Sequence, residues 1–216
     1  MSHIIALENI EMTFKKRSIF SDLHLTIDRP KVVGFIGENG SGKSVLFKII
    51  AGIYRADKGR VFIRDVKLGD GGIDFATNLG LLVDSPGFIG VYTGLANLKY
   101  LAGIQNKIDD DKIIELMQLV GLDPNDKTLV KNYSLGMKQK LGIIQAVMEN
   151  QDIIILDEPF NALDAKSVSI VKELVMTLFE EGKTILLTSH NQMDLDDLCH
   201  EMYRIEDFKL NPVSTK

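Results

Sequence analysis

A glycine-rich run at residues 37–44 constrains the fold of this chain more than any other feature. It reads Gly-Glu-Asn-Gly-Ser-Gly-Lys-Ser, in which four residues separate the first glycine from a Gly-Lys-Ser end. Residues 31–36 before it are rich in β-branched and aromatic side chains, and 43–51 after it carry apolar residues at helical spacing. The run is therefore predicted to join a buried strand to a helix.

This setting predicts a phosphate-binding loop. Glycine lets backbone N–H groups approach an anion closely, and the N-terminus of the following helix points its free N–H groups and positive dipole end at it. Lys43 can reach the β and γ phosphates of ATP, and the Ser44 hydroxyl can bind Mg²⁺. The alternative is a plain glycine-rich turn, which the flanking strand and helix disfavour. The predicted ATP-binding residues of the loop are Gly37, Glu38, Asn39, Gly40, Ser41, Gly42, Lys43, Ser44 and Val45.

Two carboxylates follow a second apolar run. Residues 153–156 are Ile-Ile-Ile-Leu, typical of a buried parallel strand, and Asp157 and Glu158 come next. Ligands of open α/β sheets bind at the carboxyl ends of the strands. We therefore expect Asp157 to bind Mg²⁺ and Glu158 to polarise an attacking water. The alternative is that these acids only cap a helix.

The remaining patterns predict an α/β protein with a helical insertion. Strands are expected at 4–14, 23–27, 60–64 and 78–83, helices between 92 and 149, and a return to alternating strands and helices from 153 onward. A final helix near 191–199 and a short strand end the pattern. This division predicts one domain over 1–216, with a nucleotide-binding core at 1–83 and 151–216 and a helical lobe at about 84–150.

Composition narrows the possible partners. The net charge is −5, which argues against a nucleic-acid surface, since that would need clustered Lys and Arg. The single cysteine, Cys199, fits a reducing compartment. No segment approaches the 18 or so apolar residues of a membrane helix, so no direct membrane insertion and a cytoplasmic location are expected.

Five further segments fall in a characteristic order. They are Phe14, Val83-Asp84-Ser85-Pro86, the run from Tyr133 through Ser134, Leu135, Gly136 and Met137 to Lys140, the run Asn161-Ala162-Leu163-Asp164, and Thr188-Ser189-His190. Together with the phosphate loop and the acidic strand end, they make the chain resemble an ATP-binding subunit of an ABC transporter over about residues 4–206. The Tyr-Ser-Leu-Gly-Met run is similar to the bacitracin- and lantibiotic-export subgroup.

The resemblance implies a fold and an activity. The fold is a P-loop NTPase core with a mainly parallel sheet, an N-terminal antiparallel β subdomain and a helical lobe. The activity is ATP hydrolysis with Mg²⁺, coupled to transport. Two such chains, as a homodimer or a heterodimer with a similar chain, close head to tail around ATP.

The resemblance also implies residue roles, each with a plainer alternative. Ser134 and Gly136 would contact the γ-phosphate held by the partner chain, or Ser134 would only cap a helix. Asp164 would lie in a loop that crosses the dimer interface, or cap the next helix. His190 would bind the γ-phosphate and position water beside the catalytic Glu158, and Phe14 would stack on adenine; otherwise both are structural.

Two departures from the family pattern matter. Leu135 and Met137 replace a glycine and a glutamine of the usual Leu-Ser-Gly-Gly-Gln signature. Asp84 replaces a glutamine that touches Mg²⁺ and couples ATP binding to the membrane subunit. Aspartate can also bind Mg²⁺, so Asp84 joins Ser44 and Asp157 as an expected metal ligand.

The expected function is the ATPase subunit of a transporter, most consistent with an exporter of a peptide, antibiotic or other amphipathic compound. Its partner would be an integral membrane permease that holds it at the cytoplasmic face of the membrane. Residues 87–92, Gly-Phe-Ile-Gly-Val-Tyr, are expected to face that partner or, alternatively, to pack inward. The main alternative function is a soluble ABC-type ATPase in a non-transport complex; a nucleotide-binding module without turnover is disfavoured by Glu158 and His190.

Overall fold

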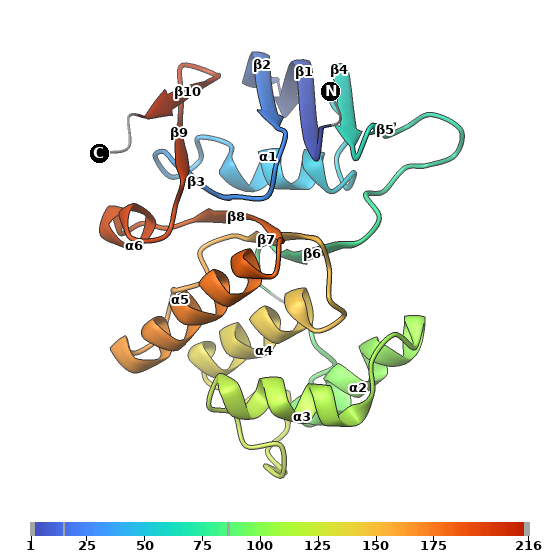
Figure 1. Cartoon of the computed structure of the whole chain (residues 1–216), viewed down its shortest axis with the longest axis vertical. Helices are drawn as coiled ribbons and strands as arrows, with labels where there is room; N and C mark the ends of the chain where they lie inside the picture. The colour runs from blue at the N-terminus through green and yellow to red at the C-terminus, as the bar shows by residue number, and fades with distance from the viewer. Residues whose placement is uncertain (1–2, 15, 86, 214–216) are drawn as a thin grey trace.

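Two β-sheets enclose helix α1 (Lys43–Ile50) in the computed structural model, which describes residues 3–14, 16–85 and 87–213 (Figure 1). The first sheet is antiparallel and lies at the N-terminal end of the chain. Its strand order is β2-β1-β4-β5, and neighbouring strands pair in opposite directions. The strands are β1 (Ile5–Phe14), β2 (Arg17–Ile27), β4 (Lys58–Ile63) and β5 (Val66–Lys67).

The second sheet is mainly parallel and carries the ends that build the site. Its order is β10-β9-β3-β8-β7-β6, and all neighbours run parallel except the β9–β10 pair. The strands are β3 (Val32–Ile36), β6 (Leu79–Leu82), β7 (Ile153–Leu156), β8 (Thr184–Thr188), β9 (Glu201–Glu206) and β10 (Lys209–Val213). Strands β3, β8 and β7 are adjacent, so their carboxyl ends meet at one edge.

The strand β7 illustrates why the central strands are apolar throughout. Successive side chains of a strand point to opposite faces of the sheet. Ile153 and Ile155 pack into the core around α1, whereas Ile154 and Leu156 pack into a second core among the other helices. Because both faces are covered, neither set of side chains meets water, and the sequence has no polar alternation.

Helices cover the opposite face of the large sheet from α1 (Figure 1). Glycine permits the closest of these contacts: a Cβ at Gly80 on β6 would lie 1.7 Å from the Ala146 carbonyl oxygen of α4. The helices are α2 (Gly94–Gln105), α3 (Asp110–Leu119), α4 (Leu135–Val147), α5 (Ala165–Glu180) and the short α6 (Gln192–Asp196), with a 3-10 turn at Val130–Asn132. No helix in the described part of the chain is long and apolar enough to cross a bilayer.

The predicted fold class is confirmed: an antiparallel N-terminal sheet, a mainly parallel sheet and a set of helices between β6 and β7. Strand β2 begins at Arg17, six residues before the predicted strand at 23–27. Four of the six residues at 17–22 are exposed and polar, so this half of the strand has no apolar pattern to predict it. Strands β5 and β10 were not predicted. The helices at 94–147 share one apolar core with the large sheet, and the boundaries of a core and a lobe stay a prediction.

Candidate functional site

The glycine-rich loop leaves a helix N-terminus open. Gly40 and Gly42 have φ angles of 78° and 111°, which side chains other than glycine adopt only with strain. Gly42 precedes α1 without any side-chain cap, and the first turn of α1 holds no acidic residue. The free N–H groups of that turn and the positive end of the helix dipole therefore face outward, as an anion site requires.

Lys43 is buried inside this loop. Its side chain is held by two backbone contacts, in which Nζ donates to the Gly37 carbonyl oxygen at 2.8 Å and to the Glu38 carbonyl oxygen at 3.2 Å. A buried ammonium needs such partners, because desolvation otherwise makes the charge costly. Two carbonyl groups of the loop therefore hold the Lys43 ammonium, which is predicted to contact phosphate, inside the loop.

Asp157 connects the loop to the sheet edge. Its Oδ2 accepts a hydrogen bond from Ser44 Oγ on α1, and its Oδ1 accepts one from Thr188 Oγ1 at the end of β8, at 2.7 Å. Thr188 is fully buried. The two expected metal ligands Ser44 and Asp157 therefore lie side by side, with hard oxygen atoms of the kind that Mg²⁺ prefers.

Glu158 is held on three sides. Its backbone N–H donates to Thr188 Oγ1 at 2.8 Å, its carbonyl oxygen accepts from Gln139 Nε2 at 2.8 Å, and its Oε2 accepts from the His190 N–H at 3.0 Å. Its φ of 52° is an uncommon, strained value for a non-glycine residue. Strain of this kind persists where the surroundings over-determine the backbone, as these three contacts do.

The Glu158 carboxylate is only partly satisfied. His190 Nε2 lies 3.4 Å from Oε1, and this buried oxygen has no hydrogen-bond partner among the described residues. Burial raises the pKa of the carboxyl, and the Asp157 charge adds to the rise, while His190 and Lys43 oppose it. A carboxylate with a raised pKa and a spare lone pair is suited to accept a proton.

These predicted residues meet at one cavity of about 290 Å³. Its lining includes the two left-handed glycines, the loop lysine, both carboxylates and the histidine: Ile19, Asn39, Gly40, Gly42, Lys43, Ser44, Val45, Asp157, Glu158 and His190. His190 follows the end of the 37–45 loop by 145 residues (190 minus 45), and the sheet brings the loop, the 157–158 pair and His190 to one edge.

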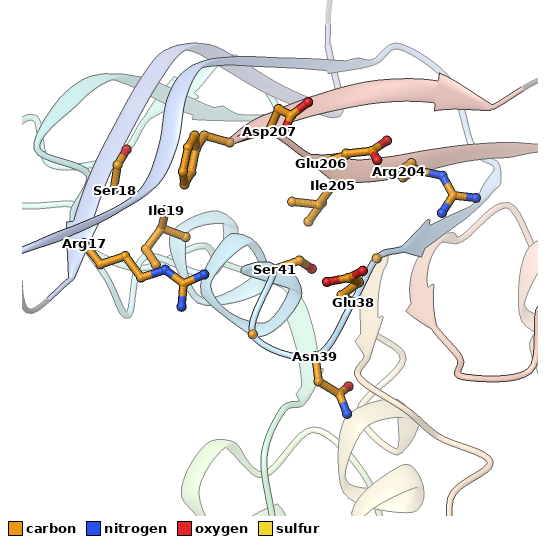
Figure 2. Close-up of a pocket in the computed structure, with 13 residues that line it drawn as sticks. Arg17, Ser18, Ile19, Glu38, Asn39, Ser41, Arg204, Ile205, Glu206 and Asp207 are labelled. Carbon is orange, nitrogen blue, oxygen red and sulfur yellow. The ribbon is translucent and has the colours of Figure 1, made fainter.

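A second cavity, of about 390 Å³, lies beside the same loop (Figure 2). Arg17, Ser18 and Ile19 line it from β2, and the turn and end of β9 line it from the other side. The charged groups of its lining are the guanidinium groups of Arg17 and Arg204 and the carboxylates of Glu38, Glu206 and Asp207. This mixed charge does not favour a phosphate in the way that the open N-terminus of α1 does.

Asp84 lies near the metal ligands but is already paired. It lines a third cavity, of about 670 Å³, together with Ser44 and Asp157. Its Oδ2 is 2.6 Å from Lys48 Nζ, and this hydrogen bond raises the pKa of Lys48. No cluster of three or more His, Cys, Asp or Glu side chains suited to a metal occurs in the described ranges. The metal role of Asp84 stays a prediction.

The residues of the expected dimer contacts all have structural roles within the chain. Ser134 caps α4 by accepting from Met137 N at 3.1 Å, and Asp164 caps α5 by accepting from Ser167 N at 2.7 Å. A Cβ at Gly136 would lie 2.6 Å from the Ala162 carbonyl oxygen, so a close approach of α4 to the loop before α5 requires glycine. Leu135 is 65% exposed, and this end of α4 is open to a partner.

Phe14 lies at the end of β1 and is 44% exposed. Its ring stacks on Tyr54, with centroids 6.3 Å apart and an interplanar angle of 22°. It is therefore neither a core residue nor isolated. Its adenine contact stays a prediction.

Thr188 and Gln139 contact the predicted site residues, although the sequence patterns assign neither a role. A polar residue that ends an apolar strand, as Thr188 does, is a usable signal. Gln139 lies on α4, and its contact to the Glu158 backbone spans 19 residues that give no local hint.

The raised pKa of Glu158 makes stability depend on pH in a defined direction. The folded state keeps this proton to higher pH than the unfolded state, so wild-type stability falls as pH rises from the unfolded pKa through the folded pKa. The amide side chain introduced by Glu158→Gln does not titrate. The melting temperature of this variant minus that of wild type is therefore expected to rise with pH between the unfolded-state and folded-state pKa of Glu158 and to level off above the folded-state pKa. Thermal melts between about pH 4 and pH 8 test this. Glu180→Gln, an exposed change on α5, should track wild type; a Glu158→Gln advantage that shrinks with pH would contradict the assignment.

The chain matches known proteins over nearly its whole length. The family model described as ABC transporter matches residues 20–161. YybJ of Bacillus subtilis, an uncharacterized ABC transporter ATP-binding protein, is 33% identical over 91% of this chain and 89% of its own. The bacitracin transport ATP-binding protein BcrA of Enterococcus faecalis is 27% identical over 98% of this chain and 71% of its own. The lantibiotic transport ATP-binding protein SrtF of Streptococcus pyogenes is 29% identical over 91% and 84%.

Solved structures agree on the fold. An ATP-binding cassette in a dimeric post-hydrolysis state, bound to ADP and Pi, has a TM-score of 0.87 to this chain with 22% identity, over 98% of this chain and 99% of that one. The resemblance predicted from the sequence motifs is confirmed. The chain belongs to the ABC transporter family and is an ATP-binding ATPase subunit of that family.

Proposed function

We propose that Glu158 is the general base of ATP hydrolysis in this subunit and that His190 positions the reacting water and the γ-phosphate. The observation that carries this proposal is the half-buried Glu158 carboxylate, with a raised pKa, in one cavity with Lys43 and the open N-terminus of α1. Phosphoryl transfer depends mainly on positioning and charge stabilisation, which this arrangement can supply. The loop residues 37–45 bind the phosphates, and Phe14 stacks on the adenine.

Magnesium fits two oxygen ligands that line this cavity. Ser44 Oγ and the Asp157 carboxylate already contact each other, and an alcohol and a carboxylate are suitable ligands for this hard cation. Ser44 and Asp157 would hold the ion, and Asp84 is a third candidate. When bound, the ion would neutralise phosphate charge. The hydrogen bond from Thr188 to Asp157 Oδ1 orients this carboxylate.

Glu158→Gln is the direct test of the base. The amide keeps the size of the side chain but cannot accept a proton, so turnover should fall by about 10²–10⁴-fold while ATP still binds. Steady-state ATPase assays and calorimetric ATP binding measure the two effects, with Glu180→Gln as the matched control. A Glu158→Gln variant with wild-type turnover would show that another group is the base.

We further propose that two chains close head to tail around ATP, as a homodimer or with a similar chain. The exposed N-terminal end of α4 supports this, since Ser134 and the Gly136 N–H stand at a helix N-terminus open to a partner's γ-phosphate. Asp164 would lie at the interface as well as capping α5. In the Glu158→Gln variant, ATP should then raise the mass measured by light scattering to twice the 24.1 kDa of one chain.

The partner that we propose is a membrane permease that exports a peptide, an antibiotic or another amphipathic compound. BcrA and SrtF, whose names specify bacitracin and lantibiotic transport, support this class of cargo. Docking on the permease would hold the subunit at the cytoplasmic face of the membrane. The division into a core at 1–83 and 151–216 and a lobe at about 84–150 would place the docking surface where the two meet.

The apolar segment at 87–92 is our candidate for that surface. The exposed fractions of Ile89, Val91 and Tyr92 are 37%, 64% and 41%, and Phe88 is half-buried against the core. The buried Asn97 holds the backbone of this segment in place. Its side-chain oxygen accepts a hydrogen bond from the Ile89 N–H, and its amide nitrogen donates one to the Ile89 carbonyl oxygen. Exposed apolar side chains on a backbone held by hydrogen bonds indicate an interface rather than a loosely packed loop.

Tyr92→Asp is expected to fold and to bind ATP with wild-type affinity but to lose co-purification with the permease. A charge placed in an apolar contact costs desolvation energy in the complex and little in the free chain. Melting temperature, ATP affinity and co-purification are measured in the same variant, with Ile104→Asp, 70% exposed at the far end of α2, as the control. A stable Tyr92→Asp chain that still co-purifies with the permease would refute the docking surface.

A further inference from the structure

Lys48 is the cation that reaches Asp84. It lies one helical turn after Ser44 on α1, so the two side chains share one face of the helix. Its side chain is 18% exposed, and Nζ is 2.6 Å from Asp84 Oδ2. Asp84 has a φ of 59° and opens the segment that leads from β6 to α2. This pair therefore joins the phosphate-loop helix to the entrance of the helical region.

The same lysine contacts an aromatic pair on its other side. Its Nζ lies 5.2 Å from the centroid of the Tyr54 ring, and the Tyr54 N–H donates to the Lys48 carbonyl oxygen at 3.1 Å. The Tyr54 ring in turn stacks on Phe14. Four side chains thus form a continuous series of contacts: Phe14, Tyr54, Lys48 and Asp84.

This series is more than a surface ion pair. Exposed Lys–carboxylate pairs contribute little, because both side chains are free to move in water. The Lys48 ammonium is instead confined between a carboxylate and a ring face, both of which attract a cation. The contacts join segments around positions 14, 54 and 84 that are distant in sequence. Asp84 is followed by the 87–92 segment that Asn97 clamps.

We propose that Lys48 is a positioning residue that holds Asp84, and with it the 87–92 segment, in register with the nucleotide site. Lys48 contacts Asp84 on one side and Tyr54, which stacks on Phe14, on the other. The adenine base would contact Phe14, which reaches Lys48 through Tyr54, and the phosphates would contact the N-terminus of α1, the helix that carries Lys48. Both ends of the nucleotide would therefore be connected to the same lysine. We call this series of contacts, from Phe14 through Tyr54 and Lys48 to Asp84, the Lys48 tie. The tie itself is independent of catalysis. Its response to nucleotide rests on the function proposed above.

Hydrogen exchange of the full chain without nucleotide tests the tie. Lys48→Met keeps the aliphatic stem and removes the charge, so amides at 87–92 should exchange about threefold faster than in wild type. Lys48→Arg should restore the wild-type rate. Lys99→Met removes the Lys99–Asp110 ion pair, which lies between α2 and α3, and should leave 87–92 unchanged. Melting temperatures check that each variant is folded.

Exchange with saturating ADP tests the response to nucleotide. Wild type should change its exchange at 87–92 when ADP binds, and Lys48→Met should lose most of that change while ADP affinity stays within about threefold. Wild-type exchange at 87–92 in Lys48→Met without ADP would overturn the tie, whether or not the chain hydrolyses ATP. Loss of ADP binding in Lys48→Met, not rescued by Lys48→Arg, would also overturn it, by making Lys48 a direct ligand.

Discussion

The nucleotide site depends on the two hydrogen bonds that the Asp157 carboxylate accepts from Ser44 and Thr188. They fasten helix α1 and strand β8 to the end of β7, so that the glycine loop, the acidic strand end and the histidine segment meet. The Thr188 hydroxyl also accepts the Glu158 N–H, which fixes the strained backbone of the proposed base. One buried threonine therefore holds both the Asp157 carboxylate and the Glu158 backbone. These bonds connect the loop and the proposed base, which lie on separate elements.

Features encoded locally could be predicted from the sequence. The loop at 37–44 needs its glycines at fixed positions, and the run at 153–156 is apolar because both faces of β7 are covered. The carboxyl ends of neighbouring parallel strands lie at one edge of a sheet, which explains why motifs at 37–45, 157–158 and 190 could be expected there together. The glycine loop and the acidic strand end could therefore be predicted from local patterns, whereas the antiparallel N-terminal sheet and the role of His190 were expected from the family resemblance.

Long-range contacts could not be predicted. The pairing of Asp84 with Lys48 joins residues from two elements, and neither local pattern specifies it. Gly136 matched a family signature, but its close packing against Ala162 depends on the path of another loop. Strand β5 has only two residues, Val66–Lys67, too few for a periodic pattern. Positions of this kind are set by packing rather than by propensity, and they include the tie that we infer through Lys48.

ATP binding by Lys43→Ala tests the central claim of this account most directly. The claim is that the loop at 37–44 binds the phosphates and that the buried Lys43 ammonium supplies its charge. Calorimetry with Mg²⁺-ATP, alongside the exposed control Lys112→Ala on α3, should give tight binding and turnover for wild type and for the control. Lys43→Ala should lose both while keeping its fold by circular dichroism. A folded Lys43→Ala chain with wild-type ATP affinity and turnover would contradict the account.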